Sequence, residues 1–153
     1  MQVFSKLSEI MINTFEKHLQ EASRFIKNLA MQLGTPDDTD HAVRVLRSVF
    51  RTLRRRIIPD ESLHIVSQLP LVLKGMYVDG WTINEPLSEA QTLDEFLFDI
   101  RNNMGQRANA DFASDDLARK KITAVFNVLK QFISKGELRH VRDELPEEIA
   151  QMV

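Results

Sequence analysis

The chain contains no cysteine, and glycine and proline occur only five times each among its 153 residues. The absence of cysteine excludes disulfides, thiolate catalysis and cysteine zinc sites. Tyrosine and tryptophan occur once each, whereas Leu, Ile, Phe, Met, Glu, Lys and Arg are abundant, which favours helices over sheets. No apolar run approaches the roughly 20 residues that span a bilayer, and the N-terminus lacks a basic leader followed by an apolar run. We therefore expect no membrane segment, no signal peptide and a cytoplasmic location.

The composition predicts one globular domain, because 43% of the residues are hydrophobic and 27% are charged. The net charge of −2 is unevenly divided along the chain. Residues 1–76 hold eleven Lys and Arg against eight Asp and Glu, and residues 77–153 hold nine against fourteen. The two parts can attract each other within or between molecules, but the overall charge does not favour binding to nucleic acid.

Apolar residues recur every three or four positions, which predicts an all-α protein, a helical bundle. Thr35 is expected to cap the second helix with Pro36 in its first position, and Thr92 with Glu95 and Ser134 with Glu137 form expected capping boxes. Gly34 is the expected stop of the first helix, Met104 is expected in the core, and residues 105–113 are expected to form a loop. The predicted helices cover approximately residues 3–33, as one long helix or two, and 36 or 38–57, 59–69, 70–77, 92–104, 114–133, 134–145 and 146–152.

The chain also contains an internal repeat with an offset of 76 residues. The stretch SVFRTLRRRIIPDESLHIVSQLPLVLKGM aligns without a gap over AVFNVLKQFISKGELRHVRDELPEEIAQM. The identical positions are mostly apolar residues at helical spacing together with a helix-breaking proline, which indicates duplication of a fold rather than of a reaction. The sequence therefore predicts two pseudo-repeated units in a single domain, with unit one at about 15–78, a connection at 79–91 and unit two at about 92–153.

These stretches, with the run RVLRSVFRTLRRRI, the segment DESLHIVSQLPLVLKGMYVDGW and the later AVFNVLKQFISKGELRHVRDELPEEI, resemble a bacterial family of unknown function, the domain of unknown function numbered 2267. The resemblance extends from about Phe15 to Met152. It implies an all-helical fold of two related units. It implies no activity, substrate or catalytic residue, so no functional site is transferred from it.

A doubled Glu-x-x-His motif is the main candidate for a metal site. Glu61 with His64, and Glu137 with His140, each place a carboxylate and an imidazole on one helix face, as in di-iron carboxylate bundles. Such bundles also need carboxylates from two further long helices, and here prolines end the motif helices early. The interpretation favoured by the sequence is structural, with Glu137 serving a capping box, so no metal or cofactor is assigned.

A row of arginines on the second predicted helix is the candidate partner surface. They lie mostly opposite the apolar stripe, where they can hold nucleic acid or an acidic protein, or pair with the acidic second half of the chain. Apart from Phe50, which belongs to the apolar stripe, no aromatic residue is interleaved with them, so the sequence favours pairing within the chain and makes nucleic acid the less favoured ligand. The row comprises Arg44, Arg47, Arg51, Arg54, Arg55 and Arg56.

No catalytic residue is assigned, because the chain has no Gly-rich phosphate loop, nucleophile elbow or HExxH motif. Tyr77 and Trp81 are expected to pack over the core rather than form a partner surface. The near-heptad stripe at the N-terminus predicts that residues 15–33 pack within the protein, while residues 1–14 are the candidate for docking on a second molecule.

The leading hypothesis is a non-enzymatic interaction or structural module that binds a protein partner or itself. The alternatives are a metal-binding protein or enzyme using the Glu-x-x-His pairs and a nucleic-acid-binding regulator.

Overall fold

The computed structural model describes residues 1–103 and 106–153 and is all-helical, as predicted. No strand occurs in this part of the chain, and none of its helices is both long enough and apolar enough to cross a bilayer. The helices are α1 (Gln2–Gln32), α2 (Thr39–Arg56), α3 (Pro59–Gln68), α4 (Leu71–Val78), α5 (Leu93–Asn103), α6 (Gln106–Asp111), α7 (Asp115–Leu129), α8 (Lys135–Asp143) and α9 (Glu147–Ala150).

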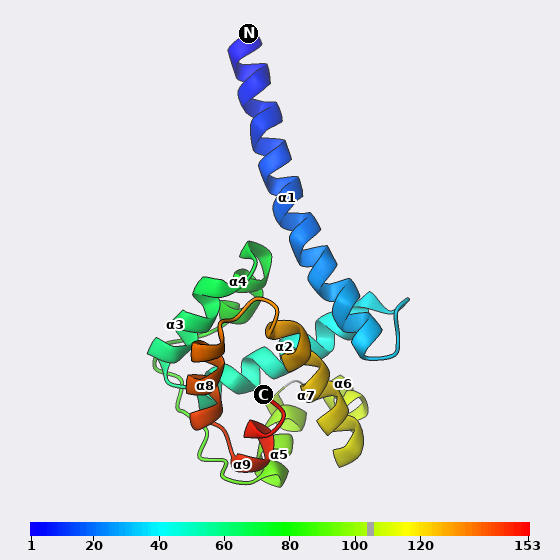
Figure 1. The fold of residues 1–153 in the computed structure, drawn as a ribbon, viewed down its shortest axis with the longest axis vertical. Coiled ribbons are helices and arrows are strands. Elements are labelled where there is room, and N and C mark those ends of the chain that lie inside the picture. The colour runs from blue at the N-terminus through cyan, green and yellow to red at the C-terminus, as the bar shows by residue number, and fades with distance from the viewer. Residues whose placement is uncertain (104–105) are drawn as a thin grey trace.

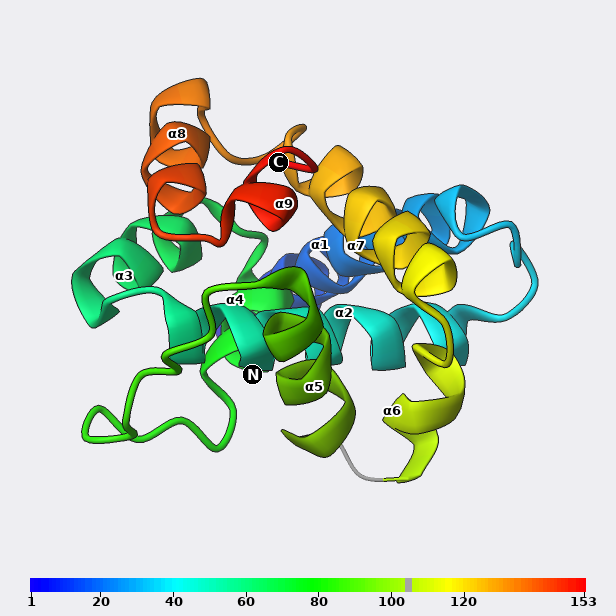
Figure 2. The same cartoon turned by 90° about the horizontal axis from the view of Figure 1, so that it is seen from below.

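α2 forms the centre of the fold (Figure 2) and packs against α1, α4, α5, α6 and α7. Its buried positions recur every three or four residues, which gives it a continuous apolar stripe. The stripe consists of Ala42, Val45, Leu46, Val49, Phe50 and Leu53. To one side, α3 packs against α8, and α8 packs against α9. This contact joins segments of the two predicted repeat units.

α1 is one helix of 31 residues, and only its second half belongs to the core (Figure 1). Its buried residues begin at Ala22, where it meets α2, α4 and α7. The prediction that residues 15–33 pack within the protein is wrong for Phe15 and Leu19, whose exposed fractions are 62% and 60%. The reason is geometric: the helix continues beyond the body, and no other described helix runs along its first part.

Local capping signals set most of the helix ends. Gly34, with φ of +75°, ends α1 in a Schellman arrangement in which the amide of Thr35 donates to the carbonyl of Ala30. The predicted cap of α2 by Thr35 is wrong, because Asp38 accepts from the amide of His41 instead. The predicted box between Thr92 and Glu95 is confirmed, with both reciprocal hydrogen bonds at 3.2 Å.

A short helix, α6, occupies residues 106–111 of the stretch predicted as a loop, so that prediction is wrong there. Tertiary contacts support it: Ala108 and Phe112 are buried, and Arg101 Nε donates to the carbonyl of Phe112 at 2.7 Å. The predicted burial of Met104 and the predicted loop start at Gly105 lie outside the described residues.

Tyr77 at the end of α4 and Trp81 after it pack over the core, as expected. Tyr77 is fully buried, its ring lies 5.1 Å from that of Phe50, and Trp81 meets it edge-on at 6.1 Å. α3 and α8 begin at Pro59 and Lys135, which are 76 positions apart, so these helix starts are compatible with the repeat. The division into two units stays a prediction.

Candidate functional site

The first candidate surface is the N-terminal arm, which we define as residues 2–21 of α1. Eight large apolar side chains on the arm are exposed, with exposed fractions between 52% and 78%. Monomeric proteins rarely leave a contiguous apolar surface of this size uncovered. The eight residues are Val3, Phe4, Leu7, Ile10, Met11, Ile12, Phe15 and Leu19.

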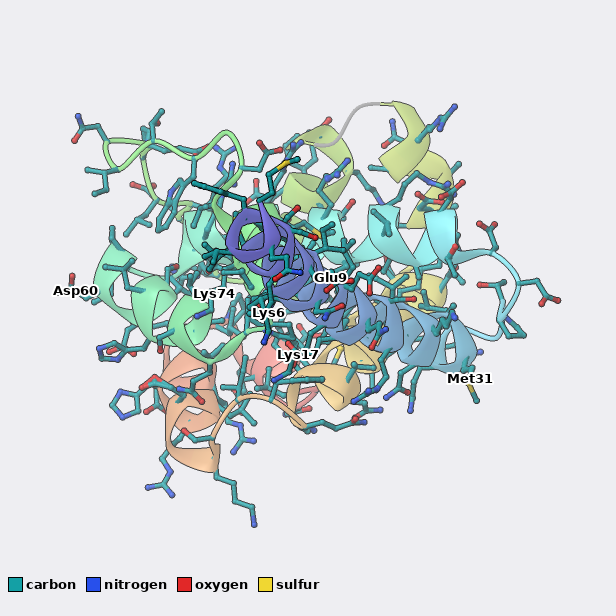
Figure 3. The ribbon with its side chains drawn as sticks, turned by 90° about the horizontal axis from the view of Figure 1, so that it is seen from above. Lys6, Glu9, Lys17, Met31, Asp60 and Lys74 are labelled. Atoms are coloured by element: carbon teal, nitrogen blue, oxygen red, sulfur yellow. The ribbon has the colours of Figure 1, made fainter. Side chains whose placement is uncertain are left out.

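The polar side of the arm carries charges of both signs. Figure 3, which looks along α1 from its N-terminal end, labels Lys6, Glu9 and Lys17. The arm holds two lysines and three glutamates in all. A helix that binds an anionic membrane or nucleic acid usually has a Lys/Arg-rich polar face. The arm therefore lacks the charge that those two ligands require.

The arginine row of α2 is largely engaged within the chain. Arg44 donates to both carboxylate oxygens of Asp111, at 3.2 and 3.4 Å. Arg51 lies 3.9 Å from a carboxylate oxygen of Asp79, and Arg55 lies 3.7 Å from one of Glu85. All three carboxylates belong to the acidic second part of the chain. The geometry thus favours the pairing interpretation for these arginines, and binding of an external partner stays a prediction.

Arg54 differs from its neighbours because it points inward and is only 6% exposed. Its Nη1 donates to the carbonyls of Tyr77 and Asp79, at 2.9 and 2.7 Å. A side chain held in this way is not accessible to a partner. Arg47, half-buried on the same helix, stays a candidate partner residue.

The two Glu-x-x-His pairs, 76 residues apart in sequence, meet where α3 packs against α8. His64 Nδ1 lies 3.1 Å from Glu137 Oε1 and 3.8 Å from Glu61 Oε2. His140 Nδ1 lies 3.5 Å from Glu61 Oε1. Each imidazole therefore faces the carboxylate of the opposite motif, a convergence that the sequence alone does not predict.

The role predicted for Glu137 is only half right. Its amide donates to Ser134 Oγ at 3.3 Å, as a capping box requires. The reciprocal bond is missing, because the amide of Ser134 donates to Gln68 Oε1 at 2.6 Å. The carboxylate of Glu137 is therefore not used by the cap and turns to His64. This removes one of the arguments for a purely structural role.

A second polar cluster, which sequence reasoning missed, surrounds His41. Lys121 Nζ lies 3.0 Å from His41 Nε2 and also contacts the carbonyl of Asp111, while His41 Nδ1 lies 3.1 Å from Thr35 Oγ1. Because an ammonium can only donate, Nε2 must accept and Nδ1 must carry the proton. Lys121 lies on the buried side of α7, one residue before Ile122. A lysine at a position expected to be buried was the signal from which the sequence could have predicted this cluster.

Stability should fall in acid because of His41. Burial, and then the charge of Lys121, lower the pKa of His41 below its ordinary value of 6.5. The unfolded chain therefore binds this proton at a higher pH than the folded protein, so stability is lost as the pH falls from 6.5 through the folded pKa. We expect His41→Gln to lose less stability than the wild type between about pH 7 and about pH 5 in urea unfolding.

The control for this prediction is His18→Gln, because His18 lies on α1 beside Glu21 and its side chain is 31% exposed. This variant should keep the pH dependence of the wild type. If the free energy of unfolding of His41→Gln depends on pH as steeply as that of the wild type, the interpretation that His41 is neutral in the folded protein is wrong.

The comparisons identify a family but no activity. No curated protein matches the chain. The matched region begins at Ala22, the first buried residue of α1, so the N-terminal arm lies outside it. Residues 22–152 match the family described as Uncharacterized conserved protein (DUF2267), which confirms the resemblance, and the chain belongs to this family.

Proposed function

We propose that the protein is an interaction module that associates with a second copy of itself through the N-terminal arm. The observation that carries this proposal is the exposure of the arm's eight large apolar side chains. Burying a side chain of this size contributes about 1.5–3 kcal/mol, so a partner that covers the arm gains a large hydrophobic stabilisation.

The apolar stripe that α1 packs on the body extends into the arm. Positions 4, 7, 11 and 15 follow the same three- and four-residue spacing as the buried positions 22, 25 and 29. At 100° per residue, both sets point to one side of the helix. The body covers the inner part of this stripe, and the outer part requires another surface.

The arrangement of the apolar residues around Met11 supports a second copy as that surface. Positions 7 and 15, 10 and 12, and 3 and 19 are equidistant from Met11, and all six hold large apolar residues. In an antiparallel pair of arms with Met11 facing Met11, a residue that precedes Met11 on one helix lies beside the residue that follows Met11 by the same number of positions on the other. Each of these three pairs of positions therefore places apolar residues on both helices. A patch that matches itself under a two-fold rotation is the requirement for a symmetric dimer.

The size and charge of the arm agree with a second copy of the chain as the partner. A standard interface buries about 800 Å² on each partner, and eight half-exposed side chains of this size offer an area of that order. The near balance of lysine and glutamate on the arm adds little repulsion between two copies.

The test is the molar mass of the 17.7 kDa chain across a concentration series in analytical ultracentrifugation. We expect a dimer, and we expect Met11→Glu to weaken it by about 100-fold or more, because two carboxylates then meet at the centre of the interface. Met11 is exposed, so the substitution leaves the core intact. Mixing Met11→Glu with Met11→Lys should restore a dimer.

Glu9→Ala, which changes the polar side of the arm, is the matched control and should remain dimeric. A monomeric wild type at all concentrations would refute self-association. A dimer that persists in Met11→Glu, or charge-reversed variants that do not pair, would refute the arm as its interface.

A further inference from the structure

We propose that Glu61, His64, Glu137 and His140 bind one divalent transition-metal ion of the zinc type between α3 and α8. This inference rests on residues remote from the arm, so it stands or falls independently of self-association. Figure 3 shows Asp60, the neighbour of Glu61, at the edge of the body away from the arm.

The distances within the cluster agree with tetrahedral coordination. Metal–ligand bonds of about 2.1 Å to imidazole and carboxylate place neighbouring ligand atoms about 3.4 Å apart in a tetrahedron. The separations of 3.1, 3.5 and 3.8 Å between imidazole nitrogens and carboxylate oxygens lie on both sides of this value. One ligand atom from each of Glu61, His64 and Glu137 fits within a mutual distance of 4.8 Å.

The four side chains form a site that is buried on one side and open to solvent on the other. The carboxylates of Glu61 and Glu137 form its base, with exposed fractions of 18% and 15%, while His64 and His140 are 59% and 58% exposed. Oε2 of each glutamate is buried without a hydrogen-bond partner. A buried carboxylate oxygen of this kind is costly unless a cation or donor reaches it. The exposed His140 ring can rotate to become the fourth ligand.

Contacts outside the cluster hold α3 and α8 together without an ion. Gln68 at the end of α3 accepts from the amide of Ser134, and Glu144 beyond α8 accepts from the amide of Ile58 at 2.8 Å. The helices that carry the ligands are therefore positioned from both ends. Such pre-organisation reduces the conformational entropy that the protein loses when it binds the metal.

The ligand types restrict the ion. Two imidazoles and two carboxylates suit Zn²⁺ and its transition-metal neighbours, whereas Mg²⁺ and Ca²⁺ prefer oxygen ligands alone. The competing explanation is two separate Glu–His ion pairs. That explanation requires one partner for each imidazole, but His64 Nδ1 lies near carboxylates of both motifs. A shared ion accounts for the convergence of Glu61, His64 and Glu137, with His140 as the ligand that rotates to complete the site.

The experiment is a calorimetric titration of chelator-treated protein with Zn²⁺, repeated with Co²⁺, whose visible absorption reports tetrahedral geometry. We expect one ion per chain, a raised melting temperature with Zn²⁺, and no competition from Mg²⁺ or Ca²⁺. His64→Ala, His140→Ala and Glu137→Gln should each weaken binding by about tenfold or more. Circular dichroism of the metal-free variants establishes that they fold.

His18→Ala is the matched control. His18 also forms an i,i+3 pair with a glutamate, Glu21 at 3.7 Å, but α1 offers no second pair to complete a site. This variant should bind Zn²⁺ like the wild type. Absence of binding, an equal loss in His18→Ala, or full binding in folded His64→Ala would each overturn the proposal.

Discussion

Replacing Tyr77 by alanine is expected to lower the free energy of unfolding by about 3–5 kcal/mol, the range for large aromatic side chains removed from a core. Tyr77 is fully buried between Phe50 and Trp81, and its hydroxyl lies 2.8 Å from Ser62 Oγ. The substitution creates a cavity and leaves the hydroxyl of Ser62 buried without its partner. Urea unfolding followed by far-ultraviolet circular dichroism measures the loss.

Tyr77→Phe separates the two causes. It keeps the ring and removes only the hydroxyl, so the expected loss is about 1–3 kcal/mol, the cost of an unpaired buried hydrogen-bonding group. Burial also raises the pKa of Tyr77, which is consistent with a hydroxyl that stays neutral. If Tyr77→Ala were no more destabilising than Tyr77→Phe, the aromatic packing would contribute nothing, contrary to our interpretation.

Arg54→Met should be the second most damaging of these substitutions, with an expected loss of about 2–4 kcal/mol. Arg54 Nη1 donates to the two carbonyls that end α4, those of Tyr77 and Asp79. Hydrogen bonds to charged groups contribute about 1.5–3 kcal/mol, and methionine fills much of the same volume without donating. The carbonyl of Tyr77 would then be left in the interior without this donor.

Arg24→Met is the control for this prediction, because Arg24 is exposed on α1. Surface substitutions of this kind usually change stability by less than about 0.5 kcal/mol. Burial lowers the pKa of Arg54, but the residue stays charged at neutral pH, so its contribution should be insensitive to pH near 7. Equal stability of the two variants would show that Arg54 does not support the end of α4.

Local sequence was sufficient wherever a helix depends on its own residues. The spacing of apolar residues in α2, the glycine after α1 and the box formed by Thr92 and Glu95 act over a few residues, so they could be predicted. One error occurs where two local solutions compete, whereas the errors at Phe15, Leu19 and α6 depend on contacts between helices. Thr35 and Asp38 could both cap α2, and the side chain of Thr35 contacts His41 instead.

Sequence by itself therefore determined an all-helical chain of this family, the positions of its core stripes and the doubling of Glu-x-x-His. Only the tertiary structure decided which side chains meet: that Glu61 faces His140, that Arg54 turns inward, and that the N-terminal arm extends beyond the body. The physical reason is the distance along the chain over which each kind of interaction acts. Periodicity and caps record what a residue needs within one or two helical turns, whereas the partner of a carboxylate or an apolar face comes from segments far away in the chain, positioned by the packing of all the helices together.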